Sequence, residues 1–277
     1  MADLIKRLWT AIVLVPILLV ALFVDPTPWS ILVFATLAGG IAHDEFLRMT
    51  LPASAEDPKL DLRAPLALVG AGVLALPMVL GAGAALPLLA ASAIALALLL
   101  LARPARLADA GRHGAACLAS VLYVPLLACL WPLIKHDMGP GWLFVTLALA
   151  FMSDTGAYAF GRLWGKHKLY PAVSPGKTWE GSVGGLVGGC LATVGFGHFL
   201  LTPELSVRDG LILGVVGSLA GQVGDLFESM LKRGCGVKDS GSLLPGHGGM
   251  LDRVDALLFV GPVMYFFASG LVAARPC

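Results

Sequence analysis

Apolar residues run along this chain in nine stretches that are separated by shorter polar segments. The stretches are Leu8 to Val24, Trp29 to Ala42, Ala64 to Leu80, Ala84 to Ala102, Ala115 to Ile134, Trp142 to Phe160, Ser182 to Leu201, Asp209 to Leu231 and Val254 to Ala273. About 20 apolar residues cross a bilayer core as a helix, so the pattern predicts an all-α, polytopic integral membrane protein with about nine transmembrane helices. The second stretch is short, and Gly81 to Gly83 alone separates the third from the fourth.

Composition and charge agree with this prediction. The 277 residues are 57% hydrophobic and 13% charged, with a mean hydropathy of +0.84, which is too apolar for an ordinary water-soluble domain. If the N-terminus is cytoplasmic and all nine stretches span, all of the 19 Lys and Arg except Lys135, Arg208 and Arg275 lie on the cytoplasmic side. The positive-inside rule predicts such an asymmetry, so we expect the N-terminus inside and the C-terminus outside.

The first half of the chain, residues 1–140, carries few polar groups inside its apolar stretches. We expect it to form a scaffold of transmembrane helices. His43, Asp44 and Glu45 close its second stretch, and we interpret them as a span end at the level of the lipid headgroups.

Polar motifs concentrate in residues 141–277, which we expect to form the catalytic part, with cytoplasmic loops at 161–181 and 232–253. Asp154 lies in the sixth stretch, about two helical turns from its cytoplasmic end. A carboxylate there is costly unless it meets a cavity or a partner, which makes it a candidate for function. A salt bridge that fixes helix packing is the structural alternative.

The segment SPGKT, Ser174 to Thr178, resembles the end of a P-loop. The full pattern needs glycine where Pro171 stands, and we expect no strand before it, so a Walker-type ATPase is excluded. Lys177 remains a candidate for binding phosphate. For the neighbouring basic residues, contact with anionic lipid headgroups is an equally good interpretation.

The polar residues of the eighth stretch share one helix face and are Gln222, Asp225, Glu228 and Ser229. Two carboxylates on one face repel each other unless a cation or a basic residue lies between them. The nearest candidates are a metal ion, Lys232 and Arg233. We interpret the face as a metal-binding or substrate-binding surface, and a structural bridge to the two bases is the alternative.

A polar stretch, Lys232 to Asp255, separates the last two apolar runs and is longer than a simple turn requires. Glycines around His247 allow the backbone to approach a ligand closely, and the basic residues suit an anion. Asp252 and Asp255 offer carboxylates to a divalent cation. Together these groups indicate a metal-bound phosphate.

The run SMLKRGCGVKDSGSLLPGHGGMLDRVD, Ser229 to Asp255, resembles the signature of the phosphatidate cytidylyltransferases (CDP-diacylglycerol synthases). The blocks SDTGAY, GRLWGKHKL, SPGKTWEG and GQVGDLFES are also similar to that family. The resemblance implies an enzyme that converts CTP and phosphatidic acid to CDP-diacylglycerol and pyrophosphate with Mg²⁺ and works as a homodimer. It implies that Asp225 and Asp252 bind the metal, and it leaves a second cation open.

The chemistry of this reaction suggests a role for each candidate side chain. A phosphate monoester is mostly dianionic at neutral pH, so the lipid phosphate needs no dedicated base, and the main task is to neutralise charge. We expect catalytic groups at Asp225, Asp252, Lys232, Arg233 and Lys238. We expect substrate contacts at Asp154, Ser174, Lys177, Thr178, Asp239, His247, Gly248, Gly249 and Arg253.

We expect the protein to lie in a bacterial cytoplasmic (inner) membrane, to face the cytoplasm with its active site and to bind no nucleic acid. Two alternatives remain open. One is another membrane lipid-phosphate transferase with a nucleotide-activated substrate such as a UDP-sugar. The other is an ion-coupled transporter, which would use intramembrane carboxylates but would also be expected to show inverted-repeat halves.

Overall fold

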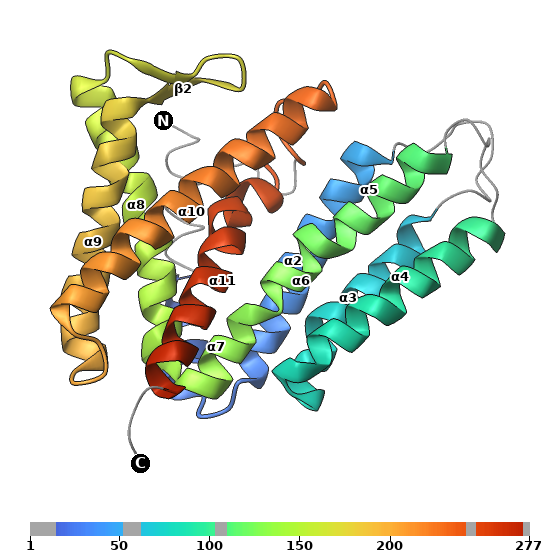
Figure 1. Ribbon diagram of the computed structural model, residues 1–277, viewed down its shortest axis with the longest axis horizontal. Helices are drawn as coiled ribbons and strands as arrows, with labels where there is room; N and C mark the ends of the chain where they lie inside the picture. The colour runs from blue at the N-terminus through green and yellow to red at the C-terminus, as the bar shows by residue number, and fades with distance from the viewer. Residues whose placement is uncertain (1–14, 52–61, 103–109, 242–247, 274–277) are drawn as a thin grey trace. The chain divides into compact units, whose positions relative to one another are not determined.

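The computed structural model describes residues 15–51, 62–102, 110–241 and 248–273 (Figure 1). In that part of the chain, eight helices are long and apolar enough to cross a membrane, and a shorter apolar helix covers Val15–Val24. The predicted all-α, polytopic fold is confirmed. The elements are η1 (Val20–Val24), α2 (Trp29–Thr50), α3 (Arg63–Leu80), η3 (Ala82–Ala84), α4 (Ala85–Ala102), α5 (Ala110–Tyr123), α6 (Pro125–Ala128), α7 (Leu130–Met138), α8 (Pro140–Trp164), β1 (Lys168–Tyr170), β2 (Ser174–Thr178), α9 (Trp179–Leu201), α10 (Val207–Gly234) and α11 (Leu251–Ala273).

The second predicted span differs most from the structure. Helix α2 is 22 residues long and continues to Thr50, well past the predicted end at Ala42. His43 and Glu45 are buried within the helix, so the prediction that the span ends at these residues is wrong. In the first predicted span, residues 8–14 lie outside the described part of the chain.

The chain folds into two compact units, and the first, unit 1, is built mainly from residues 27–133 and 239–253. Within it, α2 packs against α3 and α5, and α4 packs against the same two helices. Side chains from all four helices form a buried apolar core of Leu47, Leu51, Leu66, Val73, Leu96, Cys117 and Val121. Gly70 of α3 lets α2 approach closely, because a Cβ there would overlap the ring of His43.

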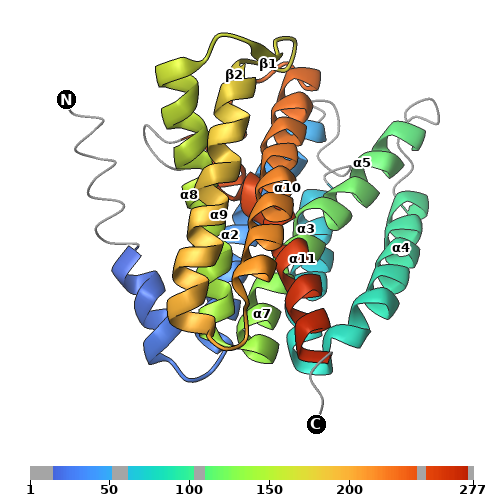
Figure 2. The same ribbon diagram turned by 60° about the vertical axis from the view of Figure 1, so that its left-hand side comes forward.

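Unit 2 is built from residues 19–26, 134–238 and 254–277. Helices α8 and α9 run side by side in opposite directions, and α10 packs against α9 (Figure 2). Glycines make these approaches possible. A Cβ on Gly156 of α8 would overlap the backbone of Gly184 on α9, and a Cβ on Gly189 would overlap the hydroxyl of Ser218 on α10.

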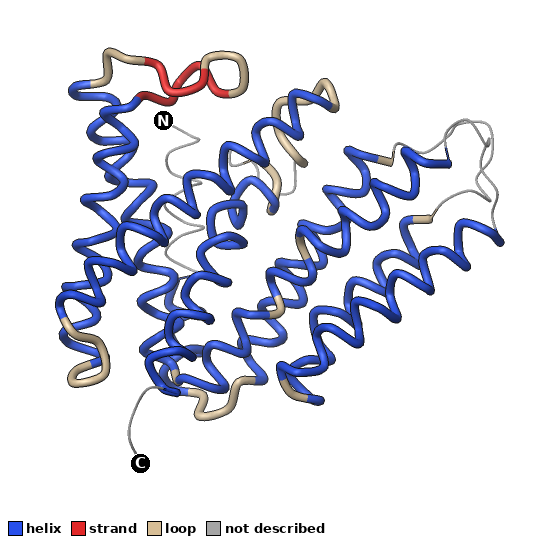
Figure 3. Tube along the Cα trace, viewed as in Figure 1, coloured by secondary structure: helices blue, strands red, loops and turns tan. Residues whose placement is uncertain are grey.

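Two short strands form an antiparallel hairpin between α8 and α9, drawn in red in Figure 3. Strand β1 precedes β2 and pairs with it from Lys168 opposite Thr178 to Tyr170 opposite Ser174. The expectation that no strand precedes the SPGKT segment is therefore wrong. The segment is itself a strand rather than a loop wrapped around a phosphate, which agrees with its not being a Walker motif.

Candidate active site

Asp225 forms an ion pair with Lys177 in unit 2. Asp225 lies on α10, and its Oδ2 is 2.7 Å from Nζ of Lys177 on β2. The two side chains are 34% and 25% exposed, whereas the Nζ atom of Lys177 is itself buried. Two motifs that the sequence analysis assigned to substrate or metal binding, SPGKTWEG and GQVGDLFES, therefore meet at this pair.

Asp255 adds a buried carboxylate beside the pair. It lies on α11, whose backbone at this position packs directly against Gly224 of α10. The carboxylate is close enough to Asp154, Asp225 and Lys177 for their charges to act on it. Three carboxyl groups and one lysine come together here, and such a set of oxygen donors suits a cation that prefers oxygen ligands.

Polar contacts hold the hairpin that carries Lys177 against the start of α9. The hydroxyl of Thr178 accepts a hydrogen bond of 3.1 Å from an amide in the first turn of α9 and so caps the helix. Glu180 accepts hydrogen bonds from the amides of Lys166 and His167, and its Oε1 lies 2.6 Å from Nδ1 of His167. Thr178, which we predicted to contact substrate, is buried and has a capping role.

The other polar residues of the α10 face have partners of their own. Gln222 donates to the carbonyl of Ser182 on α9 at 3.1 Å and accepts from its hydroxyl. Glu228 is buried, with Oε2 2.5 Å from Nζ of Lys232 one turn later. Two separate lysines therefore relieve the repulsion expected between Asp225 and Glu228. Lys232, which we predicted to bind phosphate, is buried against Glu228.

The segment after α10 presents further candidates at the surface. Arg233 donates from Nη1 to the carbonyl of Val237 at 3.2 Å, which closes a turn where Gly236 has a φ of +72°. Lys238 and Asp239 are both exposed. Basic charge is thus available from Arg233 in the last turn of α10 and from Lys238 in the segment that follows it.

In unit 1, Asp252 organises the polar segment that precedes α11. Its Oδ2 accepts hydrogen bonds from the amide of Gly249 at 2.7 Å and from the amide and hydroxyl of Ser240, both at 3.1 Å. The residue lies in the first turn of α11, where the helix dipole favours a negative charge. The carboxylate thus connects Ser240, which precedes residues 242–247, with Gly249, which follows them. His247, a predicted phosphate ligand, is among those residues and lies outside the described part.

Glu45 of α2 is a member of this cluster that our sequence analysis missed. The side chain is buried, and Oε1 accepts from the amide of Met250 at 3.0 Å. Oε2 accepts from the amide of Leu251 and from the hydroxyl of Ser240, both at 2.9 Å. These partners are 195 to 206 positions away in the sequence. One feature of the sequence could have identified Glu45. An acidic side chain beside an apolar run is energetically costly unless it has a partner.

Two glycines of this segment are required by its geometry. Gly248 has a φ of +75°, which a residue with a side chain rarely adopts. A Cβ on Gly249 would overlap the hydroxyl of Ser240 and the carboxylate of Glu45. The amide of Gly249, which we predicted to contact substrate, donates to Asp252 in this structure.

Within the described ranges, no three His, Cys, Asp or Glu side chains lie close enough to hold one metal ion together. Mg²⁺ needs no such cage, because it usually binds through one or two carboxylates, water and substrate phosphates. The oxygen donors around Asp225 fit this kind of site. Asp252 belongs to unit 1 and Asp225 to unit 2, and each fits the role of a single carboxylate ligand.

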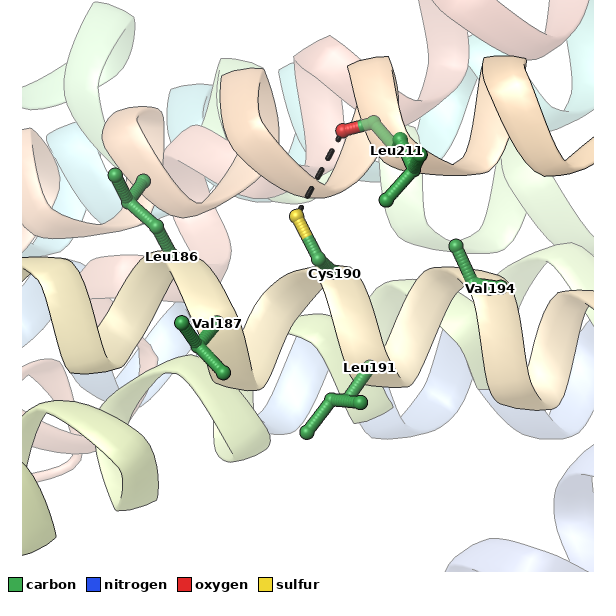
Figure 4. Close-up of a pocket in the computed structure, with 6 residues that line it drawn as sticks. All are labelled: Leu186, Val187, Cys190, Leu191, Val194 and Leu211. Carbon is green, nitrogen blue, oxygen red and sulfur yellow. Dashed lines mark hydrogen bonds between the residues drawn. The ribbon is translucent and has the colours of Figure 1, made fainter.

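An apolar cavity of about 320 Å³ lies between α9 and α10 (Figure 4). Its lining consists of Leu186, Val187, Cys190, Leu191, Val194 and Leu211. The Cys190 thiol lies 3.8 Å from the carbonyl of Leu211. The cavity offers no charged group to a phosphate and is separate in character from the polar clusters.

These features define a polytopic membrane protein whose carboxylates and lysines suit a metal and phosphates. The chain matches the sequence profile of the cytidylyltransferase family over residues 5–271, and it belongs to that family. It is similar to proteins named phosphatidate cytidylyltransferase from Staphylococcus haemolyticus (strain JCSC1435; 43% identity over 150 residues) and Staphylococcus aureus (strain COL; 42% over 152 residues). Each match covers 54% of this chain and 57% of the relative, so the chain spans just over half the length of the curated relatives it matches.

Proposed function

We propose that this protein transfers CMP from CTP to phosphatidic acid and so forms CDP-diacylglycerol and pyrophosphate for phospholipid biosynthesis. Family membership and the names of the relatives support the proposal. The structural observation that carries it is the Lys177–Asp225 pair with Asp255 beside it. A lysine suited to phosphate and carboxylates suited to a divalent cation occur together, on helices long and apolar enough to cross a membrane.

The proposed reaction depends on neutralising charge more than on moving protons. The lipid phosphate is mostly dianionic at neutral pH and is already a nucleophile. One of its oxygens forms a bond to the α-phosphorus of CTP, and the bond from that phosphorus to the leaving pyrophosphate breaks. The side chains hold the phosphates in line and offset the charge that develops on pyrophosphate.

In this proposal Asp225 and Asp252 are ligands of Mg²⁺, and Asp255 offers further oxygen donors near Asp225. When bound, Mg²⁺ neutralises phosphate charge and orients the leaving group, and a second cation is compatible with the number of carboxylates. Lys177 donates to a nucleotide phosphate. Because a lysine side chain is flexible, Lys177 can turn from Asp225 to a phosphate.

The remaining candidates keep supporting roles in the proposal. Arg233 contacts phosphates from the last turn of α10 and Lys238 from the segment after it, and Lys232 adds positive charge from the position that Glu228 fixes. The other substrate contacts are Asp154, Ser174, Thr178, Asp239, His247, Gly248, Gly249 and Arg253. The capping role of Thr178 places its contribution in holding the hairpin.

The proposed location is a bacterial cytoplasmic membrane, with the polar clusters on the cytoplasmic side. The distribution of Lys and Arg supports this orientation. CTP is available in the cytoplasm, and a lipid phosphate lies at the headgroup level where helix ends are found. The resemblance to the family supports a homodimer.

Release of pyrophosphate by the purified protein in mixed micelles tests the proposed function. We expect release when CTP, phosphatidic acid and Mg²⁺ are all present, and none when any of the three is omitted. Release of UMP from a UDP-sugar in place of this reaction would favour the other lipid-phosphate transferase. Folded protein that releases no pyrophosphate under the complete conditions would contradict the proposal.

A further inference from the structure

We infer that Glu45 is a positioning residue for Asp252. Its buried carboxylate on α2 holds the start of α11 and thereby sets how Asp252 is presented to a cation. The inference rests on the proposed function, because that function assigns Asp252 to Mg²⁺ binding. All the contacts that support it lie within unit 1.

Both oxygens of Glu45 are used to hold backbone and hydroxyl donors. They accept from the amides of Met250 and Leu251 and from the hydroxyl of Ser240, at 2.9 to 3.0 Å. Hydrogen bonds to an ionised carboxylate are roughly twice as strong as those between neutral groups. Because the Leu251 contact is buried, loss of the carboxylate would leave an amide at the start of α11 without an acceptor.

Ser240 links Glu45 directly to Asp252. Its hydroxyl lies 2.9 Å from Oε2 of Glu45 and 3.1 Å from Oδ2 of Asp252, and its single proton serves one carboxylate at a time. Gly249 forms a second link, since its amide donates to Asp252 and a Cβ at this position would overlap the carboxylate of Glu45. A shift of Glu45 therefore moves two of the groups that orient Asp252.

The negative charge of Glu45 also favours a cation near Asp252. A Gln side chain would offer one acceptor oxygen where Glu45 uses two, and it would carry no charge to repel Asp252. Two carboxylates that share one hydroxyl instead raise the negative potential around Asp252, which a divalent cation relieves. Glu45 thus contributes orientation through its hydrogen bonds and attraction through its charge.

The dependence of CMP transfer on Mg²⁺ concentration tests this role, with Glu45→Gln compared against Asp44→Asn. Asp44 is the adjacent residue on α2, is partly exposed and pairs with Arg48 at 2.7 Å, so its substitution removes the same charge outside the cluster. Loss of a residue that orients a metal ligand typically lowers metal affinity about 10–100-fold. We therefore expect Glu45→Gln to raise the half-saturating Mg²⁺ concentration about 10–100-fold. We expect kcat to recover at saturating Mg²⁺, and Asp44→Asn to behave as the unmodified protein.

A wild-type Mg²⁺ dependence in Glu45→Gln would overturn the inference. So would a fall in kcat with no change in half-saturation, because a purely structural role predicts that result. If Glu45→Gln does not purify in a folded state, Ser240→Ala removes the linking hydroxyl and leaves both carboxylates. We expect that variant to raise the half-saturating Mg²⁺ concentration about 2–10-fold, the worth of one hydrogen bond, and an unchanged value would overturn the inference.

Hydrogen exchange in the full-length protein separates this inference from the proposed function. The amides of Met250 and Leu251 should exchange faster in Glu45→Gln than in Asp44→Asn, whether or not the protein transfers CMP. If the unmodified protein makes no CDP-diacylglycerol, the proposed function fails, while the exchange rates still report on Glu45. Equal exchange in the two variants would show that Glu45 does not hold the start of α11.

Discussion

The two polar clusters hold their aspartates in different ways. Asp252 in unit 1 accepts hydrogen bonds from two amides and a hydroxyl, whereas Asp225 in unit 2 faces the partly exposed Lys177. Backbone donors fix the direction of a carboxylate and stay in place when a ligand arrives. A single ion pair to a flexible lysine side chain fixes the direction of a carboxylate less firmly. We conclude that Asp252 is suited to be a preset ligand and Asp225 an exchangeable one.

The substitution Asp225→Asn removes the carboxylate that we consider the exchangeable metal ligand. We expect kcat/KM for CMP transfer to fall roughly 100–1,000-fold, because the charge that attracts the cation is lost while the side chain keeps its size. Initial rates of CDP-diacylglycerol formation measure the effect. Asp209→Asn, at a half-buried position in the first turn of the same helix, is the control and should retain nearly full activity. Near-normal turnover in Asp225→Asn would contradict the metal assignment.

The substitution Asp252→Asn removes the carboxylate that we consider the preset metal ligand. We expect activity to fall roughly 100-fold and the amide of Gly249 to exchange hydrogen faster, because a neutral amide oxygen is a weaker acceptor than a carboxylate. Asp225→Asn should leave that exchange unchanged. Equal effects of the two variants on the exchange of Gly249 would remove the distinction between the clusters.

The substitution Lys177→Met sharpens the comparison, because it should change two constants in opposite directions. Without the lysine, a nucleotide phosphate loses a donor, and we expect the KM for CTP to rise about tenfold, the worth of one charged contact. Asp225 loses its competing cation, so the half-saturating Mg²⁺ concentration should fall. Lys168→Met, at an exposed position on β1 of the same hairpin, should change neither. A rise in both constants would argue against exchange at Asp225.

The substitution Gly249→Ala probes the packing around Asp252 and should have the smallest effect. The added Cβ would overlap Ser240 and Glu45, so we expect a loss of about 1–3 kcal/mol in the free energy of unfolding. Gly270→Ala on α11 meets no atom within 4 Å and should change stability by less than about 1 kcal/mol. Denaturation of both variants in detergent measures the difference. Similar stabilities would show that the segment adapts to a side chain.

Much of the fold could be predicted from the sequence, because apolar runs long enough to cross a bilayer leave few other structures open to them. The ends of the helices were harder to predict. Helix α2 continues through His43 and Glu45 because Glu45 finds hydrogen-bond donors from distant residues, and a single sequence does not show those partners. The hairpin was missed because SPGKT contains Pro and Gly, which usually mark loops, although its strand pairs with residues a short distance before it.

The candidate site was predicted in its residue types but not in its pairings. Lys232 and Arg233 are the bases nearest to Asp225 in sequence, yet Lys177 is its partner in the structure, and Lys232 pairs with Glu228. Helix periodicity correctly placed Asp225 and Glu228 on one face. Which lysine reaches each carboxylate depends on how β2 and α10 pack, and that packing is a tertiary property.

Transfer of label from CTP tests the central claim most directly, with CTP labelled at either the α-phosphate or the γ-phosphate. The purified protein in micelles with phosphatidic acid and Mg²⁺ should move the α-label into lipid and the γ-label into pyrophosphate. Appearance of the γ-label in lipid would indicate phosphoryl transfer instead of CMP transfer. That result, or no movement of either label by folded protein, would contradict the account.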